Sequence, residues 1–109
     1  MHDDPGNARF RFDSRLAGSA LELALAGDFD MAATFRLESE LDRLLAGGGV
    51  RRLVLDLGEV RFMDSSGLGA LLSIRERTQA LDIEMSLRDV SDPVRRLLLL
   101  TGTSGLVAD

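Results

Sequence analysis

The run Asp64-Ser65-Ser66-Gly67 combines a carboxylate with two hydroxyls where a short apolar segment passes into a helical pattern. Backbone N–H groups at the start of a helix are unpaired, and the helix dipole makes them favourable neighbours for an anion. A phosphoserine would add about 1.5–2 negative charges beside Asp64. The run is therefore a candidate phosphorylation site. Helix capping alone is the simpler interpretation, because Asp and Ser are both good N-cap residues.

Catalysis by these serines is disfavoured by the rest of the sequence. A nucleophile elbow reads Gly-x-Ser-x-Gly, and neither Ser65 nor Ser66 has a glycine two residues before it. The single histidine, His2, lies in the N-terminal tail, where it is a poor candidate for a general base. The chain has no Lys for a P-loop and no Cys for a thiolate site. We therefore expect no enzymatic activity, no cofactor and no metal.

The overall composition is that of one ordinary globular domain. The chain has 109 residues, of which 45% are hydrophobic, and a net charge of −5. This charge argues against direct binding of nucleic acid or anionic membranes. No apolar run approaches the ~18–20 residues of a membrane-spanning helix, and residues 1–8 lack the features of a signal peptide. We expect a flexible tail over 1–8, a folded domain over 9–109, no membrane insertion and a cytoplasmic location.

Apolar periodicity predicts the elements of the first half. Alternation with period two indicates strands over 10–16 and 20–26. Gly27-Asp28-Phe29-Asp30 is expected to break the second strand. Apolar residues then recur at three- and four-residue spacing over 31–46, as in an amphipathic helix. Asp30 is placed to cap this helix.

The second half continues the alternation of strands and helices. The nearly continuous apolar run 53–57 predicts a strand buried on both faces. A helix over 66–80 and a strand over 83–87 follow, and Ser91-Asp92-Pro93 begins a helix over 93–100, which Ser91 or Asp92 could cap. The order β-β-α-β-α-β-α predicts an α/β fold with a mixed sheet and helices packed on it.

Three further expectations concern individual apolar residues. Met31 and Met63 are interpreted as core residues near the Asp64-Ser65-Ser66-Gly67 run. The four leucines of 97–100 cannot all face one core on a short helix. They form either an exposed interface or a patch that neighbouring loops cover, and the sequence leaves both open.

The stretch 53–72, LVLDLGEVRFMDSSGLGALL, resembles the signature of the STAS domain, specifically that of the bacterial anti-sigma-factor antagonists. The segment Gly27–Asp30, followed directly by a helix, and the segment Ser91–Gly105 resemble two further parts of that family. The similarity extends over about residues 9–107. It implies a small STAS-like domain, in agreement with the element order predicted from periodicity.

The resemblance also implies a mechanism. Such antagonists bind an anti-sigma factor that is also a serine kinase of the GHKL ATPase type, and thereby free a sigma factor. The kinase phosphorylates the second serine of the motif, here Ser66 with Ser65 as second choice, and a PP2C-type phosphatase restores the active form. The partner-binding residues implied are Asp28, Asp30, Asp64, Ser65, Ser66, Gly67 and Leu68.

Two other functions remain open from the sequence. One is a STAS accessory subunit of a transporter or signalling assembly that is not phosphorylated. The other is a small domain that binds an anion or nucleotide at the helix start. The presence of serine at position 66 favours the switch over the accessory role, which does not require it.

Overall fold

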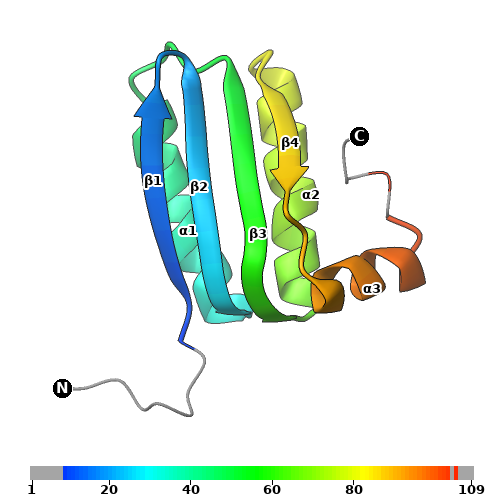
Figure 1. The fold of residues 1–109 in the computed structure, drawn as a ribbon. Helices are drawn as coiled ribbons and strands as arrows, with labels where there is room; N and C mark the ends of the chain where they lie inside the picture. The colour runs from blue at the N-terminus through cyan, green and yellow to red at the C-terminus, as the bar shows by residue number, and fades with distance from the viewer. Residues whose placement is uncertain (1–8, 104, 106–109) are drawn as a thin grey trace, which may run out of the picture.

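The computed structural model describes residues 9–103 and 105, which form a four-stranded sheet and three helices (Figure 1). The strands are β1 (Arg11–Ala17), β2 (Ala20–Phe29), β3 (Arg52–Met63) and β4 (Glu84–Arg88). The helices are α1 (Met31–Leu45), α2 (Ser65–Ala80) and α3 (Asp92–Leu100). The predicted order β-β-α-β-α-β-α is confirmed. The predicted tail and its His2 lie outside the described residues.

The sheet is mixed, as predicted, with strand order β1-β2-β3-β4. β1 and β2 pair antiparallel, whereas β2–β3 and β3–β4 pair parallel. Each parallel pair is joined by a helix, and α1 and α2 cover the same face of the sheet (Figure 1). α3 follows β4 and packs at the far end of β3.

The core lies between α1, α2 and one face of the sheet. Leu53, Leu55 and Leu57 of β3 are fully buried, and they alternate with Val54 and Asp56 on the other face. On the other face Val54 is 8% exposed and Asp56 is partly buried, so the predicted burial on both faces holds at Val54 and is incomplete at Asp56. The crossover helices α1 and α2 both lie on one face of the sheet (Figure 1), so neither of them covers the other face.

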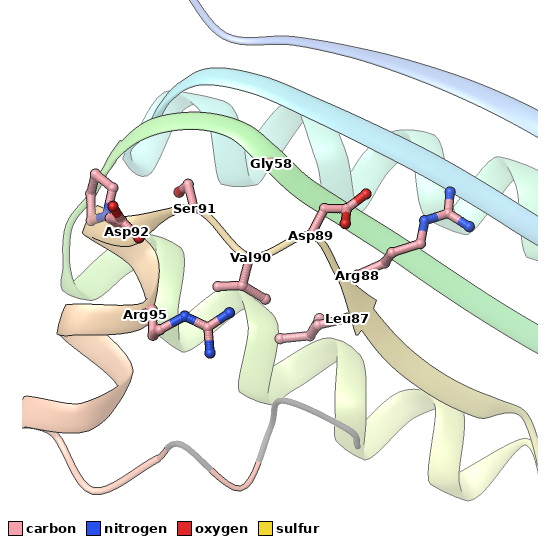
Figure 2. Close-up of a pocket in the computed structure, with 9 residues that line it drawn as sticks. Gly58, Leu87, Arg88, Asp89, Val90, Ser91, Asp92 and Arg95 are labelled. Atoms are coloured by element: carbon pink, nitrogen blue, oxygen red, sulfur yellow. The ribbon is translucent and has the colours of Figure 1, made fainter.

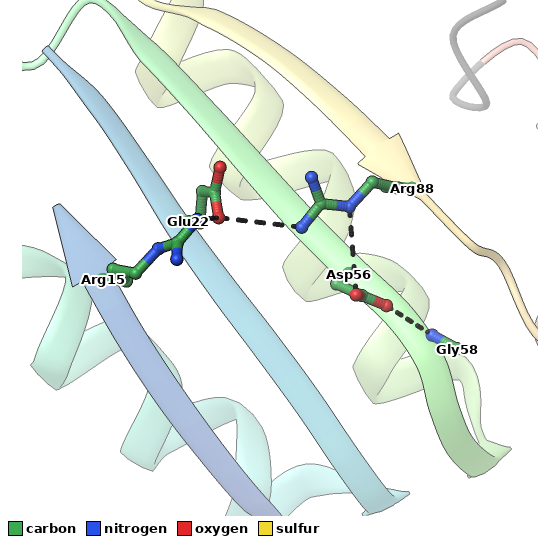
Figure 3. Close-up of polar contacts among 5 residues, drawn as sticks. All are labelled: Arg15, Glu22, Asp56, Gly58 and Arg88. Carbon is green, nitrogen blue, oxygen red and sulfur yellow. Dashed lines mark hydrogen bonds and ion pairs between the residues drawn. The ribbon is translucent and has the colours of Figure 1, made fainter. Parts of the chain in front are cut away.

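A chain of polar contacts crosses the uncovered face (Figure 3). Glu22 of β2 accepts a hydrogen bond from Arg15 at 3.0 Å and lies 3.7 Å from a guanidinium nitrogen of Arg88. Arg88 also approaches Asp56 at 3.9 Å, and the second oxygen of Asp56 accepts from the Gly58 N–H at 3.0 Å. These partners explain how a carboxylate is tolerated within an apolar strand. Exposed pairs of this kind contribute little individually, so we assign them a structural role.

β2 and β3 are longer than predicted. Instead of ending before Gly27, β2 continues to Phe29, with register shifts between Ala24 and Ala26 and between Gly27 and Asp28. Gly27 has a φ of 93°, a conformation that glycine adopts readily. The predicted break over Gly27–Asp30 is thus an irregularity within the strand, of the kind a β-bulge produces. β3 pairs with this extension and continues to Met63.

The four leucines 97–100 divide between the core and the surface. Leu98 is fully buried and Leu97 is partly buried, whereas Leu99 and Leu100 are 64% and 79% exposed. Successive helical residues point about 100° apart, which accounts for the division. The prediction that they cannot share one core is confirmed.

Ser91 links the start of α3 to β3 by hydrogen bonds. It occupies the N-cap position of α3, but its side chain makes no capping bond there; instead its Oγ donates to the Val60 carbonyl at 2.6 Å. The Ser91 N–H also donates to the Leu57 carbonyl. The predicted side-chain cap is therefore replaced by a contact with the distal half of β3.

Replacing Ser91 by Ala is expected to lower the free energy of unfolding by about 1 kcal/mol, because the partly buried Val60 carbonyl loses a donor. Urea unfolding followed by far-UV circular dichroism would measure it, since the chain has no Trp or Tyr. Ser39→Ala, at an exposed position on α1, is the matched control. A loss no greater than that of the control would contradict the prediction.

Candidate functional site

Two helix starts lie side by side at the carboxyl edge of the sheet. Phe29 and Met63, the last residues of β2 and β3, are direct partners in the parallel register. Asp30 and Asp64 follow them and cap α1 and α2. The Ala33 N–H donates to Asp30 Oδ1 at 3.0 Å, and the Gly67 N–H donates to Asp64 Oδ1 at 3.1 Å. The predicted cap at Asp30 is confirmed, and the same chemistry recurs at Asp64.

Ser65 and Ser66 are the first and second residues of α2, so neither is the cap. Ser65 is exposed and Ser66 is partly buried. Within residues 9–103 and 105, neither hydroxyl has a hydrogen-bond partner, and no histidine is present. A serine without an activating base is a weak nucleophile, but it can accept a phosphoryl group from an enzyme that supplies the base.

Gly67 and Leu68 are buried against the sheet. A Cβ on Gly67 would lie 2.6 Å from the Phe29 carbonyl oxygen and 2.8 Å from Met63 Cγ. Leu68 is 9% exposed. These two predicted partner-binding residues therefore hold the first turn of α2 against the ends of β2 and β3. Of the other predicted partner-binding residues in this run, Ser65 is exposed, and Asp64 and Ser66 are partly buried.

Asp28 lies within β2 rather than in a loop. It is partly buried and pairs with Phe62 of β3. Asp28 and Asp30 both line a hollow of about 210 Å³, which Phe10 and Arg36 also line. The Arg36 guanidinium donates to the Phe10 carbonyl at 2.9 Å and lies over the Phe10 ring. The structure thus brings the two predicted acids together beside the start of α1.

Two exposed apolar side chains near this edge were missed by the sequence reasoning. Met31 is 60% exposed and Phe35 is 67% exposed, whereas Met63 is only 7% exposed. The prediction that Met31 fills the core was wrong, and that for Met63 is confirmed. The signal was present in the helix pattern, because residues 31 and 35 fall outside the buried stripe Ala33, Leu37 and Leu41.

An open hollow of about 780 Å³ lies elsewhere, between the end of β4 and the start of α3 (Figure 2). Arg88, Asp89 and Arg95 are among its lining residues, and none of the predicted site residues is. A Cβ on Gly58 would lie 2.9 Å from the Asp89 carbonyl oxygen, so the strand and loop are closely packed there. One of its charged lining residues, Arg88, is paired with Glu22 and Asp56. We assign this hollow no function.

Metal-binding clusters and membrane-spanning helices are not found in the part of the chain that the structure describes. No cluster of three or more His, Asp or Glu side chains there is arranged to hold a metal ion. No described helix is long and apolar enough to cross a membrane.

Replacing Asp64 by Ala is expected to lower the free energy of unfolding by about 1 kcal/mol, since the Gly67 N–H loses its acceptor. Asp64→Asn is the matched control, because Asn caps about as well as Asp. Urea unfolding by circular dichroism would compare the two. Equal stability of Asp64→Ala and Asp64→Asn would show that the cap contributes nothing.

The fold and the edge together define a small α/β domain that presents a serine in the first turn of a helix, at the carboxyl edge of a mixed sheet. The STAS domain family profile matches residues 11–107. The chain therefore belongs to the STAS domain family.

Curated relatives and solved structures agree with this assignment. The chain is 33% identical over 82 residues to the anti-sigma F factor antagonist of Paenibacillus polymyxa, covering 75% of this chain and 70% of that protein. It is 30% identical over 86 residues to the anti-sigma-B factor antagonist of Staphylococcus aureus, covering 79% of each.

The fold is similar to that of the anti-sigma factor antagonist SpoIIAA. Its unphosphorylated form superposes with a TM-score of 0.77 at 22% identity, covering 93% of this chain and 87% of that one. The Bacillus cell fate determinant SpoIIAA in the phosphorylated form gives 0.72 at 21% identity, covering 93% and 90%. The predicted STAS fold is confirmed.

Proposed function

We propose that this chain is an anti-sigma-factor antagonist that is switched by phosphorylation at Ser66. Its partner is an anti-sigma factor with serine kinase activity of the GHKL ATPase type, and binding releases a sigma factor in the cytoplasm. The observation that carries the proposal is the Ser66 hydroxyl, which has no hydrogen-bond partner among the described residues and lies at the start of α2, beside the start of α1. The relatives named above, which are antagonists of anti-sigma factors, support it.

The orientation of Ser66 supports it as the acceptor rather than Ser65. Eleven residues span close to three helical turns, so Ser66 and Arg77 point in nearly the same direction around α2. Arg77 forms an ion pair with Asp42 of α1, so this side of α2 faces α1. Ser65 points about 100° away from Ser66. A phosphate on Ser66 therefore lies between the two helix starts, where a partner would contact both.

The modification acts through surface charge rather than through refolding. A phosphate is tolerated at a helix start, because the unpaired N–H groups and the dipole favour an anion there. The same dianion lies close to the carboxylates of Asp64 and Asp30, which are held in place by their capping bonds. The acidic edge is suited to a basic partner surface, and added negative charge disturbs that match.

Intact-mass spectrometry tests this function most directly. The protein is incubated with ATP and each GHKL-type anti-sigma kinase of its own genome, and wild type is compared with Ser66→Ala and Ser65→Ala. We expect one phosphate on wild type and on Ser65→Ala, none on Ser66→Ala, and removal by a PP2C-type phosphatase. A phosphate retained by Ser66→Ala would overturn the assignment of the site.

The same experiment separates the switch from an accessory role. If no such kinase modifies or binds the wild-type chain, and it co-purifies instead with a transporter or scaffold, the antagonist function is excluded. The accessory role would then replace it.

A further inference from the structure

We infer that Met31, Phe35 and Gly69 together form an apolar contact surface for the anti-sigma factor, next to Ser66. We call these three residues the helix-pair surface. The inference rests on the proposed function, and it specifies which part of the partner interface is apolar and independent of phosphate.

The two α1 side chains of this surface point away from the sheet, on the same side of the helix as Asp42, and Phe35 also lines a hollow with Phe12 and Arg36. Asp42, eleven residues after Met31 and seven after Phe35, pairs with Arg77 of α2. At 100° per residue, both side chains lie within about 20° of the direction of Asp42 around α1. Met31 precedes Asp42 by the same eleven residues that separate Ser66 from Arg77. Met31 and Ser66 therefore lie at the same level on the two facing helices.

Gly69 contributes bare backbone on the outer side of α2. A Cβ built there would meet nothing within 4 Å, and the residue is exposed. Its φ is not in the positive range that favours glycine. Gly67, two residues earlier, has no room for a Cβ. Close packing therefore explains why position 67 is glycine, but it does not explain glycine at position 69. Glycine inside a helix is destabilising relative to alanine, and the folded domain gains nothing from it at position 69.

A partner molecule that packs closely against α2 would account for glycine at position 69. Two apolar side chains stand out from α1 while the neighbouring position on α2 is empty, so an apolar group of a partner can contact all three residues. Isolated exposed hydrophobic residues need no explanation. Here two of them lie four residues apart on the outward side of α1, and the neighbouring helix α2 carries the exposed Gly69 and the partly buried Ser66 in its first turns.

The charges around the helix-pair surface identify the occupant as a protein with a basic rim. Asp30 and Asp64 lie at the starts of the two helices, and Glu38 lies one turn beyond Phe35 on α1. The chain itself carries a net charge of −5. A second copy of this chain or an anionic membrane would be repelled by this rim. An anti-sigma factor with basic groups around an apolar projection would match it in both respects.

The test measures affinity for the cognate anti-sigma factor loaded with ADP, so that no phosphate can be transferred. Gly69→Gln places a long side chain in the empty position, and Met31→Ala and Phe35→Ala remove the apolar groups. Each is expected to weaken binding at least tenfold by isothermal titration calorimetry. The loss should be the same at low and high salt, because no charge has changed.

Matched variants control for the substitutions themselves. Ala80→Gln lies at the exposed far end of α2, and Leu81→Ala removes a leucine that is 57% exposed there. Both should bind as wild type does. Circular dichroism and urea unfolding should show Gly69→Gln to be at least as stable as wild type, because glutamine is the better helix former. If Gly69→Gln were destabilised, the result would rest on Met31→Ala and Phe35→Ala.

The outcomes separate this inference from the proposed function. If wild type binds and all three variants bind within twofold of it, the helix-pair surface is excluded while the antagonist function stands. A loss that disappears at high salt would also overturn it, since apolar contacts are not screened. If wild type binds no anti-sigma factor, the proposed function fails and this inference fails with it.

Discussion

Gly67→Ala is expected to lower the free energy of unfolding by about 1–3 kcal/mol or more, as overpacking of a close contact does. The added Cβ would lie 2.6 Å from the Phe29 carbonyl oxygen and 2.8 Å from Met63 Cγ. Met63 could shift, but the Phe29 oxygen belongs to the backbone of a paired strand and cannot. The first turn of α2 must therefore move away from the sheet, and Ser66 must move with it.

Gly69→Ala, two residues along the same helix, is the matched control. Its Cβ would meet nothing, so we expect stability to rise by about 0.5–1 kcal/mol. Urea unfolding by circular dichroism measures both variants, and mass spectrometry of kinase-treated Gly67→Ala shows whether Ser66 is still modified. If both substitutions stabilised the domain equally, the close contact at Gly67 would be refuted.

Phosphorylation of Ser66 is expected to weaken binding to the anti-sigma factor by about 2–5 kcal/mol, the usual cost of a mispaired charge in an interface. This corresponds to roughly 30-fold to several thousand-fold in Kd. The new dianion joins Asp64 and Asp30, whose carboxylates are held by their helices and cannot turn away. Titration calorimetry of the phosphorylated and unmodified chains with the ADP-loaded partner would measure the difference.

Two variants show how much of the loss of affinity is due to negative charge at position 66 in particular. Ser66→Ala should bind within a few-fold of wild type, because it removes a hydroxyl that has no partner within the described residues. Ser39→Asp adds a negative charge at an exposed position further along α1 and should bind normally. Equal affinity of phosphorylated and unmodified protein would show that the switch does not act through binding.

Much of the fold could be predicted because the determining signals are local. The helix over Met31–Leu45 follows from its apolar spacing, and its cap from an acid just before the first turn. The strand over Arg52–Met63 was shortened in the prediction, because Gly58 and Glu59 interrupt the apolar run. Pairing with β2 carries the strand through that interruption. A strand's length depends on its neighbour, which local pattern does not contain.

The candidate site was predicted only in part, because only some of its features depend on local sequence. Asp64, Ser65 and Ser66 could be placed at a helix start from residue type and order alone. Gly67 and Leu68 were grouped with them through the family resemblance, and the structure buries both. Met31 was interpreted as a core residue because it is hydrophobic, but its position on α1 directs its side chain toward solvent. Hydrophobicity alone does not show which way a helix faces.

The sequence by itself determined the order of elements, an acid before each of two helices, and the two serines that follow the second acid. These follow from periodicity, capping chemistry and the residue types available within a few positions. The tertiary structure alone decided that Phe29 and Met63 pair, which brings the two helix starts together. It also decided that Gly67 meets the Phe29 carbonyl while Gly69 meets nothing. Those contacts join residues far apart along the chain, and only the packed sheet and helices bring them into reach.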